Sequence, residues 1–229
     1  MIEKNFRPSI RRLLFALFLL GAGIIYAQQA PTLTVANTKD ESWDFTIRVM
    51  TQTFATETVF FSQAEGVTTF TANAVLFSQG QPAILLASGK TDDSRIVEYA
   101  LDVDYNGKRT MIEATVKGDV LEVRSGEKTV TLPWTPNTIL LDNNMSFMWQ
   151  YFLYYYPYAG TNDFIAVIPQ LVASQDTIAF PFTIQRAVES DGKVTLNFSL
   201  ASSLGIINAS NRYRLSHIQI GVTKMERTR

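Results

Sequence analysis

Hydrophobic and polar residues alternate along most of the chain after residue 40. In Ser42–Thr51, Trp43, Phe45, Ile47 and Val49 alternate with mostly polar neighbours. This period of two is typical of a strand with one buried and one exposed face. Similar patterns in Glu57–Gln63 and Thr68–Phe77, and a short apolar run at Ala83–Ala87, predict a mainly β protein.

Turns that contain glycine are predicted to join these strands into hairpins. Asn106-Gly107 separates two alternating strands, and both residues tolerate the positive φ angles of a type I′ turn. A two-residue loop there pairs Leu101 with Ile112 and places the apolar residues of both strands on one face. Further turns at Gly118-Asp119 and near Ser125-Gly126 extend the region into an antiparallel meander.

The C-terminal part is predicted to hold one more long hairpin and a final strand. A three-residue loop at Ser190-Asp191-Gly192 sets Phe182 opposite Leu200, which a two-residue loop would not do. Tyr213–Thr223 is predicted as the last strand, and Lys224–Arg229 as a charged tail.

One stretch, Thr138–Pro157, departs from the β pattern: TILLDNNMSFMWQYFLYYYP. It predicts a short buried strand, a polar turn with Asn143 or Asn144 as helix cap, and a helix from about Met145 that Pro157 ends. Eight of the twelve residues 147–158 are aromatic. The expected fold is therefore a large curved antiparallel meander, a half-barrel, with one central aromatic helix.

This helix has two readings. It either fills the concave face of the sheet as core, with tyrosine hydroxyls at the rim, or it encloses with the sheet an apolar cavity for a lipid-like ligand. In the second reading the ligand contacts the side chains that share one helix face at i, i+3, i+4, i+7 and i+11 spacing, which are Met145, Met148, Trp149, Phe152 and Tyr156.

The N-terminus predicts export. Four basic residues precede the apolar run Leu13–Tyr26, and Ala27 precedes the expected cut, as in a secretory signal peptide. The alternative is an uncleaved anchor. The predicted division is 1–27 signal peptide, 28–40 flexible leader and 41–229 a single β-rich domain. Because the chain has no cysteine, neither a disulfide nor a lipidated N-terminal cysteine is expected, and the predicted location is periplasmic or extracellular.

Charge and candidate catalytic residues favour binding over catalysis. Removing residues 1–27 takes four basic and one acidic side chain from 20 and 21, which leaves a net charge of −4 and argues against nucleic acid. His217 is the chain's one histidine, and no G-x-S-x-G accompanies it. Ser125–Lys128 matches the S-x-x-K motif by letter, but it lies in a predicted hairpin turn, where no helix brings the lysine back to the serine. Asp102 and Asp104 share a strand face and are interpreted as a solvated pair on the outer side of the sheet. No enzyme activity, cofactor or metal is therefore predicted.

Residues 138–170 resemble a segment of known bacterial β-domains. The segment ILLDNNMSFMWQYFLYYYP followed by FIAVIPQ resembles exported bacterial β-domains, some preceding α/β-hydrolase domains, that share an LDNN, aromatic-helix and V-x-P-Q pattern. The overall plan is also similar to periplasmic lipoprotein-carrier half-barrels. The predicted function is that of an exported non-catalytic protein that holds an apolar ligand between sheet and helix. The alternative is an accessory or interaction domain that assists another exported protein, such as a hydrolase. Membrane contact is expected only through the signal segment before cleavage.

Overall fold

The computed structural model describes residues 41–64, 67–77, 82–92, 95–142 and 145–228. The predicted signal peptide and leader lie outside these residues. One sheet of 15 strands is present, in the order β8-β7-β6-β5-β4-β3-β2-β1-β15-β14-β13-β12-β11-β10-β9. The strands are β1 (Glu41–Val49), β2 (Gln52–Ala64), β3 (Val67–Leu76), β4 (Ala83–Asp92), β5 (Arg95–Tyr105), β6 (Lys108–Lys117), β7 (Val120–Ser125), β8 (Lys128–Pro133), β9 (Thr138–Leu140), β10 (Asp163–Val167), β11 (Ala179–Ser190), β12 (Lys193–Leu200), β13 (Ser203–Ser210), β14 (Leu215–Ile220) and β15 (Thr223–Arg227).

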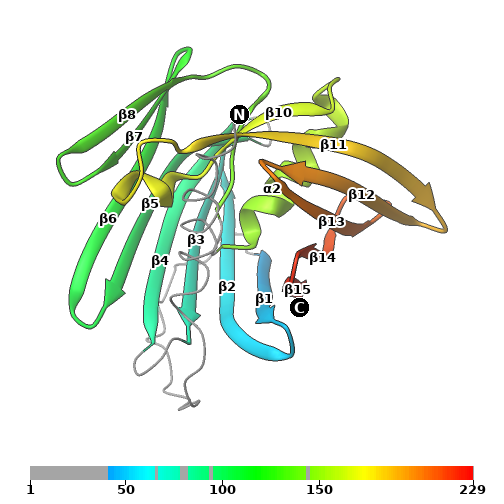
Figure 1. Cartoon of the computed structure of the whole chain (residues 1–229), viewed down its shortest axis with the longest axis horizontal. Helices are drawn as coiled ribbons and strands as arrows, with labels where there is room; N and C mark the ends of the chain where they lie inside the picture. The colour runs from blue at the N-terminus through cyan, green and yellow to red at the C-terminus, as the bar shows by residue number, and fades with distance from the viewer. Residues whose placement is uncertain (1–40, 65–66, 78–81, 93–94, 143–144, 229) are drawn as a thin grey trace, which may run out of the picture.

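The sheet curves around one short helix, α2 (Phe147–Tyr155) (Figure 1). Two 3₁₀ turns accompany it, η1 (Tyr156–Tyr158) directly after the helix and η2 (Pro169–Ala173) after β10. The predicted mainly β fold, a curved antiparallel sheet around an aromatic helix, is confirmed. The pairing of β9 with β10 is the exception, because these two strands run parallel with Ile139 beside Ala166.

The Asn106-Gly107 hairpin has the predicted register. Asn106 and Gly107 have φ angles of 57° and 72°, and Leu101 pairs with Ile112. Both of these apolar residues are buried. The local turn and the hydrophobic pattern therefore specify the same pairing.

The predicted three-residue loop at Ser190-Asp191-Gly192 is wrong. Ser190 pairs with Lys193, so the loop has two residues, Asp191 and Gly192, both with positive φ. The pairing shifts by one residue between Ile184 and Arg186, and this bulge restores the expected pair of Phe182 with Leu200. The pair of Phe182 with Leu200 is therefore present as predicted, but it results from a bulge inside β11 and not from a longer turn.

The C-terminus differs from its prediction in a second way. Strand β13 was not expected, and the predicted last strand and charged tail are two strands, β14 and β15, joined at Gly221. Strand β15 pairs with β1, with Met225 opposite Ile47 in the core. Its charged neighbours lie on the outer face, where Lys224 and Arg48 form ion pairs with Glu226. A strand with alternating charges was thus misread as a tail.

Candidate functional site

Helix α2 is anchored on one side by aromatic rings of β10, β11 and β12. The ring of Trp149 lies 6.0 Å from that of Phe182 and 5.4 Å from that of Phe198. Phe152 contacts Phe182 at 4.9 Å and Phe164 at 5.4 Å, both edge to face. These geometries are favourable for aromatic pairs, so this side of the helix is well-packed core.

The opposite side of the helix is buried as well. Phe147 and Tyr151 pack on Phe70, and Tyr151 also contacts Phe61. Every helix residue from Phe147 to Leu153 is buried, and exposure begins only in the last turn. The helix therefore fills much of the space inside the curved sheet, as the first reading of the sequence expected.

Polar side chains of the helix have specific partners. Gln150 is fully buried; its amide donates to the Tyr213 carbonyl at 2.6 Å, and its Oε1 accepts from the Leu215 amide at 2.6 Å. Near the rim, the hydroxyl of Tyr155 donates to the Pro136 carbonyl and that of Tyr156 to Asn162. Gln150 thus fixes the helix to the chain between β13 and β14.

A buried carboxyl group meets the N-terminus of the helix. Glu57 on β2 is 2% exposed and accepts from the amides of Ser146 at 2.6 Å and Phe147 at 3.2 Å. These amides belong to the first turn of the helix, where the N–H groups have no hydrogen-bond acceptor within the helix itself. Burial raises the pKa of Glu57 to about 8, although the two amide donors lower it.

A second buried carboxyl group lies near Glu57. Asp142 is 1% exposed and accepts a hydrogen bond from the hydroxyl of Tyr99. Tyr99 is itself 2% exposed, and its hydroxyl oxygen accepts a hydrogen bond from the Gln170 side-chain amide at 3.0 Å. Burial, followed by the charge of Asp142, raises the pKa of Tyr99 well above its usual value. This polar cluster (Glu57, Tyr99, Asp142 and Gln170) links β2, β5, the end of β9 and η2 to the start of α2.

Sequence reasoning did not identify Glu57 as part of a site, although one signal was present. Glu57 shares the inward positions of its strand with Ala55, Val59 and Phe61, all of which are buried. A glutamate at such a position indicates a special partner, because a buried carboxyl group is unstable without hydrogen bonds. The predicted helix caps, Asn143 and Asn144, lie outside the described residues.

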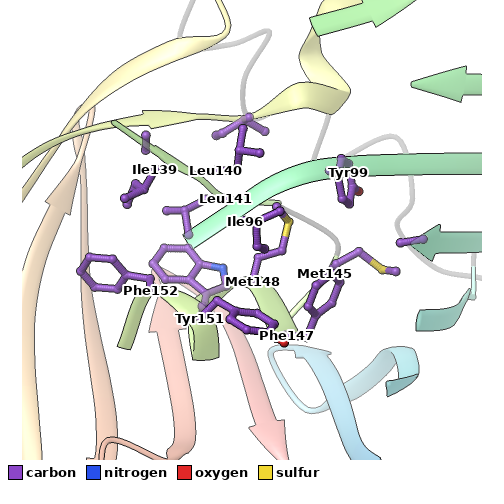
Figure 2. Close-up of a cluster of buried hydrophobic side chains, with 14 of the residues drawn as sticks. Ile96, Tyr99, Ile139, Leu140, Leu141, Met145, Phe147, Met148, Tyr151 and Phe152 are labelled. Carbon is purple, nitrogen blue, oxygen red and sulfur yellow. The ribbon is translucent and has the colours of Figure 1, made fainter. Parts of the chain in front are cut away.

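A small hollow lies where α2 meets β5 and β9. Its buried lining is almost entirely apolar, and its volume is about 10 Å³, room for about one water molecule. Figure 2 shows Met148 beside Ile96, with the β9 side chains on the same side of the helix. The lining consists of Ile96, Ile139, Leu140, Met148, Tyr151 and Phe152, and the half-buried Arg95 and Tyr155 lie at its outer side.

The predicted ligand-contacting residues divide between the hollow and the solid core. Met148 and Phe152 line the hollow. Met145 is fully buried, and Trp149 packs against Phe182 and Phe198. Tyr156 lies at the rim and packs on Phe152. Arg95 was not expected at this place, because a basic residue at the start of a strand looks like ordinary surface charge.

The candidate catalytic residues of the sequence do not converge. His217 is half-buried on the outer side of β14, where Nε2 lies 2.9 Å from Asn208 Nδ2. Burial lowers the pKa of His217. Asp102 forms an ion pair with the exposed Arg109, and Ser125 and Lys128 pair across a hairpin. Within the described residues, no three His, Cys, Asp or Glu side chains are grouped as metal ligands would be.

Fold and site define a barrel-like, mainly β protein with an internal aromatic helix. No family model and no curated protein matches the sequence. The fold is similar to a β-barrel-like protein of the domain of unknown function DUF1849 from Brucella abortus, at 11% identity and a TM-score of 0.45 over 82% of this chain and 93% of that chain. It is also similar to a DUF1089 family protein from Pseudomonas aeruginosa, at 9% identity and a TM-score of 0.42 over 86% and 98%. The resemblance of residues 138–170 to exported β-domains stays a prediction.

Proposed function

We propose that this protein is an exported, non-catalytic binding protein that takes up an apolar, lipid-like ligand where α2 meets β5 and β9. The observation that carries the proposal is the apolar hollow at this junction, which has Arg95 and Tyr155 at its outer side. It lies between the sheet and the helix, where the sequence predicted a ligand. Export is supported by the N-terminal sequence, which lies outside the described residues.

Ligand uptake requires side chains to move. Drug-sized ligands occupy pockets of about 300 Å³ or more, far larger than the hollow. Met148 is suited to such movement, because its side chain is unbranched and has three rotatable bonds. Phe152 carries no polar atom whose hydrogen bond would be lost. The proposed site therefore opens by rearrangement of α2 side chains against the strands.

The test is to fill the hollow. We expect wild-type protein to take up the neutral apolar dye Nile red, seen as a rise in its fluorescence, and Met148→Trp to reduce this uptake at least about tenfold because the indole occupies the site. The matched control is Met111→Trp, since Met111 is 55% exposed on β6. A thermal melt of each variant checks that it is folded.

Two outcomes would contradict the proposal. If wild-type protein takes up no dye, the remaining hypothesis is the alternative that the protein is an accessory or interaction domain of another exported protein. Equal uptake by folded Met148→Trp and Met111→Trp would place the dye elsewhere on the molecule.

A further inference from the structure

Arg95 is held in a fixed position beside the hollow. Its guanidinium carbon lies 4.7 Å from the ring centre of Trp134 and 5.3 Å from that of Tyr155. One of its terminal nitrogens, Nη1, donates to the Thr135 carbonyl at 2.8 Å. The ring of Tyr155 is fixed in turn by the hydrogen bond from its hydroxyl to the Pro136 carbonyl at 2.6 Å. Stacking on aromatic rings therefore pre-orients this cation.

Arg95 forms no ion pair with a carboxylate of the described residues, and Asp92, its partner in the β4–β5 register, is exposed. The ion pairs among the described residues involve other basic side chains, on the outer face of the sheet or at the edge near β8. A guanidinium has five N–H donors, and one of these is used on Thr135. The remaining donors suit a planar or tetrahedral anion, which arginine binds through two parallel hydrogen bonds.

The surroundings of Arg95 combine this cation with apolar surface. Ile96, its neighbour on β5, is 3% exposed and lines the hollow together with Met148 and Phe152 of α2. A molecule bound here would thus meet a positive charge at the outer side and apolar side chains further in. This order of polarity matches a molecule with one charged end and one hydrocarbon chain.

We infer that the ligand is a single-chain anionic amphiphile, whose carboxylate or phosphate head binds Arg95 while its alkyl chain enters between α2, β5 and β9. This inference rests on the proposed function and adds the chemical class of the ligand. A neutral lipid would offer the guanidinium no anionic partner. Arg95 is accordingly the residue that selects the head group, and Met148 and Phe152 are those that admit the chain.

The test compares ligands that differ only at the head. Oleate, oleyl alcohol and oleoyl lysophosphatidate displace Nile red from full-length protein, and their competition constants are measured. We expect oleate to bind wild type about tenfold more tightly than oleyl alcohol, because a charge-assisted hydrogen-bonded pair contributes that much. Arg95→Met should remove this preference and leave oleyl alcohol unchanged, whereas Arg95→Lys should keep part of it. The ratio of lysophosphatidate to oleate shows whether a phosphate or a carboxylate head is favoured.

Arg124→Met on β7 is the matched control, because the Arg124 side chain is 56% exposed. Near-equal binding of oleate and oleyl alcohol by wild type would overturn the inference and leave the proposed function standing. The same holds if a folded Arg95→Met variant retains the preference for oleate. Failure of all three lipids and of the dye to bind would overturn both.

Discussion

At the residue scale, Glu57 is the side chain with the least ordinary environment. It places a carboxyl group inside the sheet, 2% exposed, against the first turn of α2. Burial, with a smaller contribution from the nearby Asp142, raises its pKa from 4.5 to about 8, although the two amide donors lower it. The protonated group still accepts hydrogen bonds from the Ser146 and Phe147 amides through its oxygens. The start of α2 therefore depends on a carboxyl group carried by a strand residue far away in sequence.

This environment predicts that the folded protein loses stability as pH rises. The folded-state pKa of Glu57 lies above the unfolded value, so the folded state binds the extra proton, and the stabilisation is complete below pH 4.5 and lost as pH rises towards 8. The free energy of unfolding should fall by about 1.4 kcal/mol per pH unit at most within this window. Urea unfolding at pH 5, 6.5 and 8 measures the slope.

Glu57→Gln removes the titrating group and keeps an acceptor for the helix amides. Between pH 5 and pH 8 the free energy of unfolding of this variant should depend less on pH than that of wild type. The difference in slope is at most about 1.4 kcal/mol per pH unit, which corresponds to one proton. Glu113→Gln is the control, because Glu113 is exposed on β6. Identical pH profiles for wild type and Glu57→Gln would show that Glu57 does not carry the proton.

At the element scale, α2 is part of the core as well as a wall of the proposed site. Its side chains contact both halves of the sheet, Phe61 and Phe70 on one side and Phe182 and Phe198 on the other. A nine-residue helix is too short to be stable alone in water, so tertiary packing must hold it in place. The helix and the curvature of the sheet therefore stabilise each other.

Trp149→Ala tests this role. The change removes a side chain that is 2% exposed, and we expect a loss of about 3–5 kcal/mol in the free energy of unfolding, from lost burial and the cavity left behind. Tyr158→Ala, at an 83% exposed aromatic residue just after the helix, should change it by less than about 0.5 kcal/mol. Denaturant unfolding compares the two, and equal losses would exclude α2 as the anchor of the core.

At the scale of the whole molecule, the two ends of the described chain meet. Strand β15 pairs with β1, so the C-terminal strand joins the N-terminal strand within one sheet. None of the described helices is long and apolar enough to span a membrane. The sheet begins at Glu41, and removal of residues 1–27 would take no residue from it. Cleavage of the predicted signal peptide would thus leave every strand of the described sheet in the chain.

Export is tested on the protein produced in a bacterial host. We expect the protein in the periplasmic or extracellular fraction with a mature N-terminus near Gln28, because the signal peptidase cleaves after small residues such as Ala27. N-terminal sequencing after cell fractionation measures both points. Periplasmic protein that still begins at Met1 would contradict cleavage, and protein retained in the cytoplasm would contradict export.

The sequence by itself determined the elements whose causes are local. Alternation along single strands and the Asn106-Gly107 turn specified a meander with Leu101 opposite Ile112. The run of rings after Met145 specified an internal aromatic helix. Each of these results depends on residues close together in the chain, whose spacing is visible in the sequence.

Only the tertiary structure decided features that depend on distant contacts. The bulge before Arg186, the parallel β9–β10 pair and the β1–β15 pair depend on how the whole sheet curves. Glu57 meets an amide 89 residues away, and Arg95 stacks on rings from a loop and from α2. The alternation places Glu57 at an inward position, but it does not show which group Glu57 meets there. The fold alone determines which groups Glu57 and Arg95 meet, and for that reason the partners of these two side chains escaped the sequence analysis.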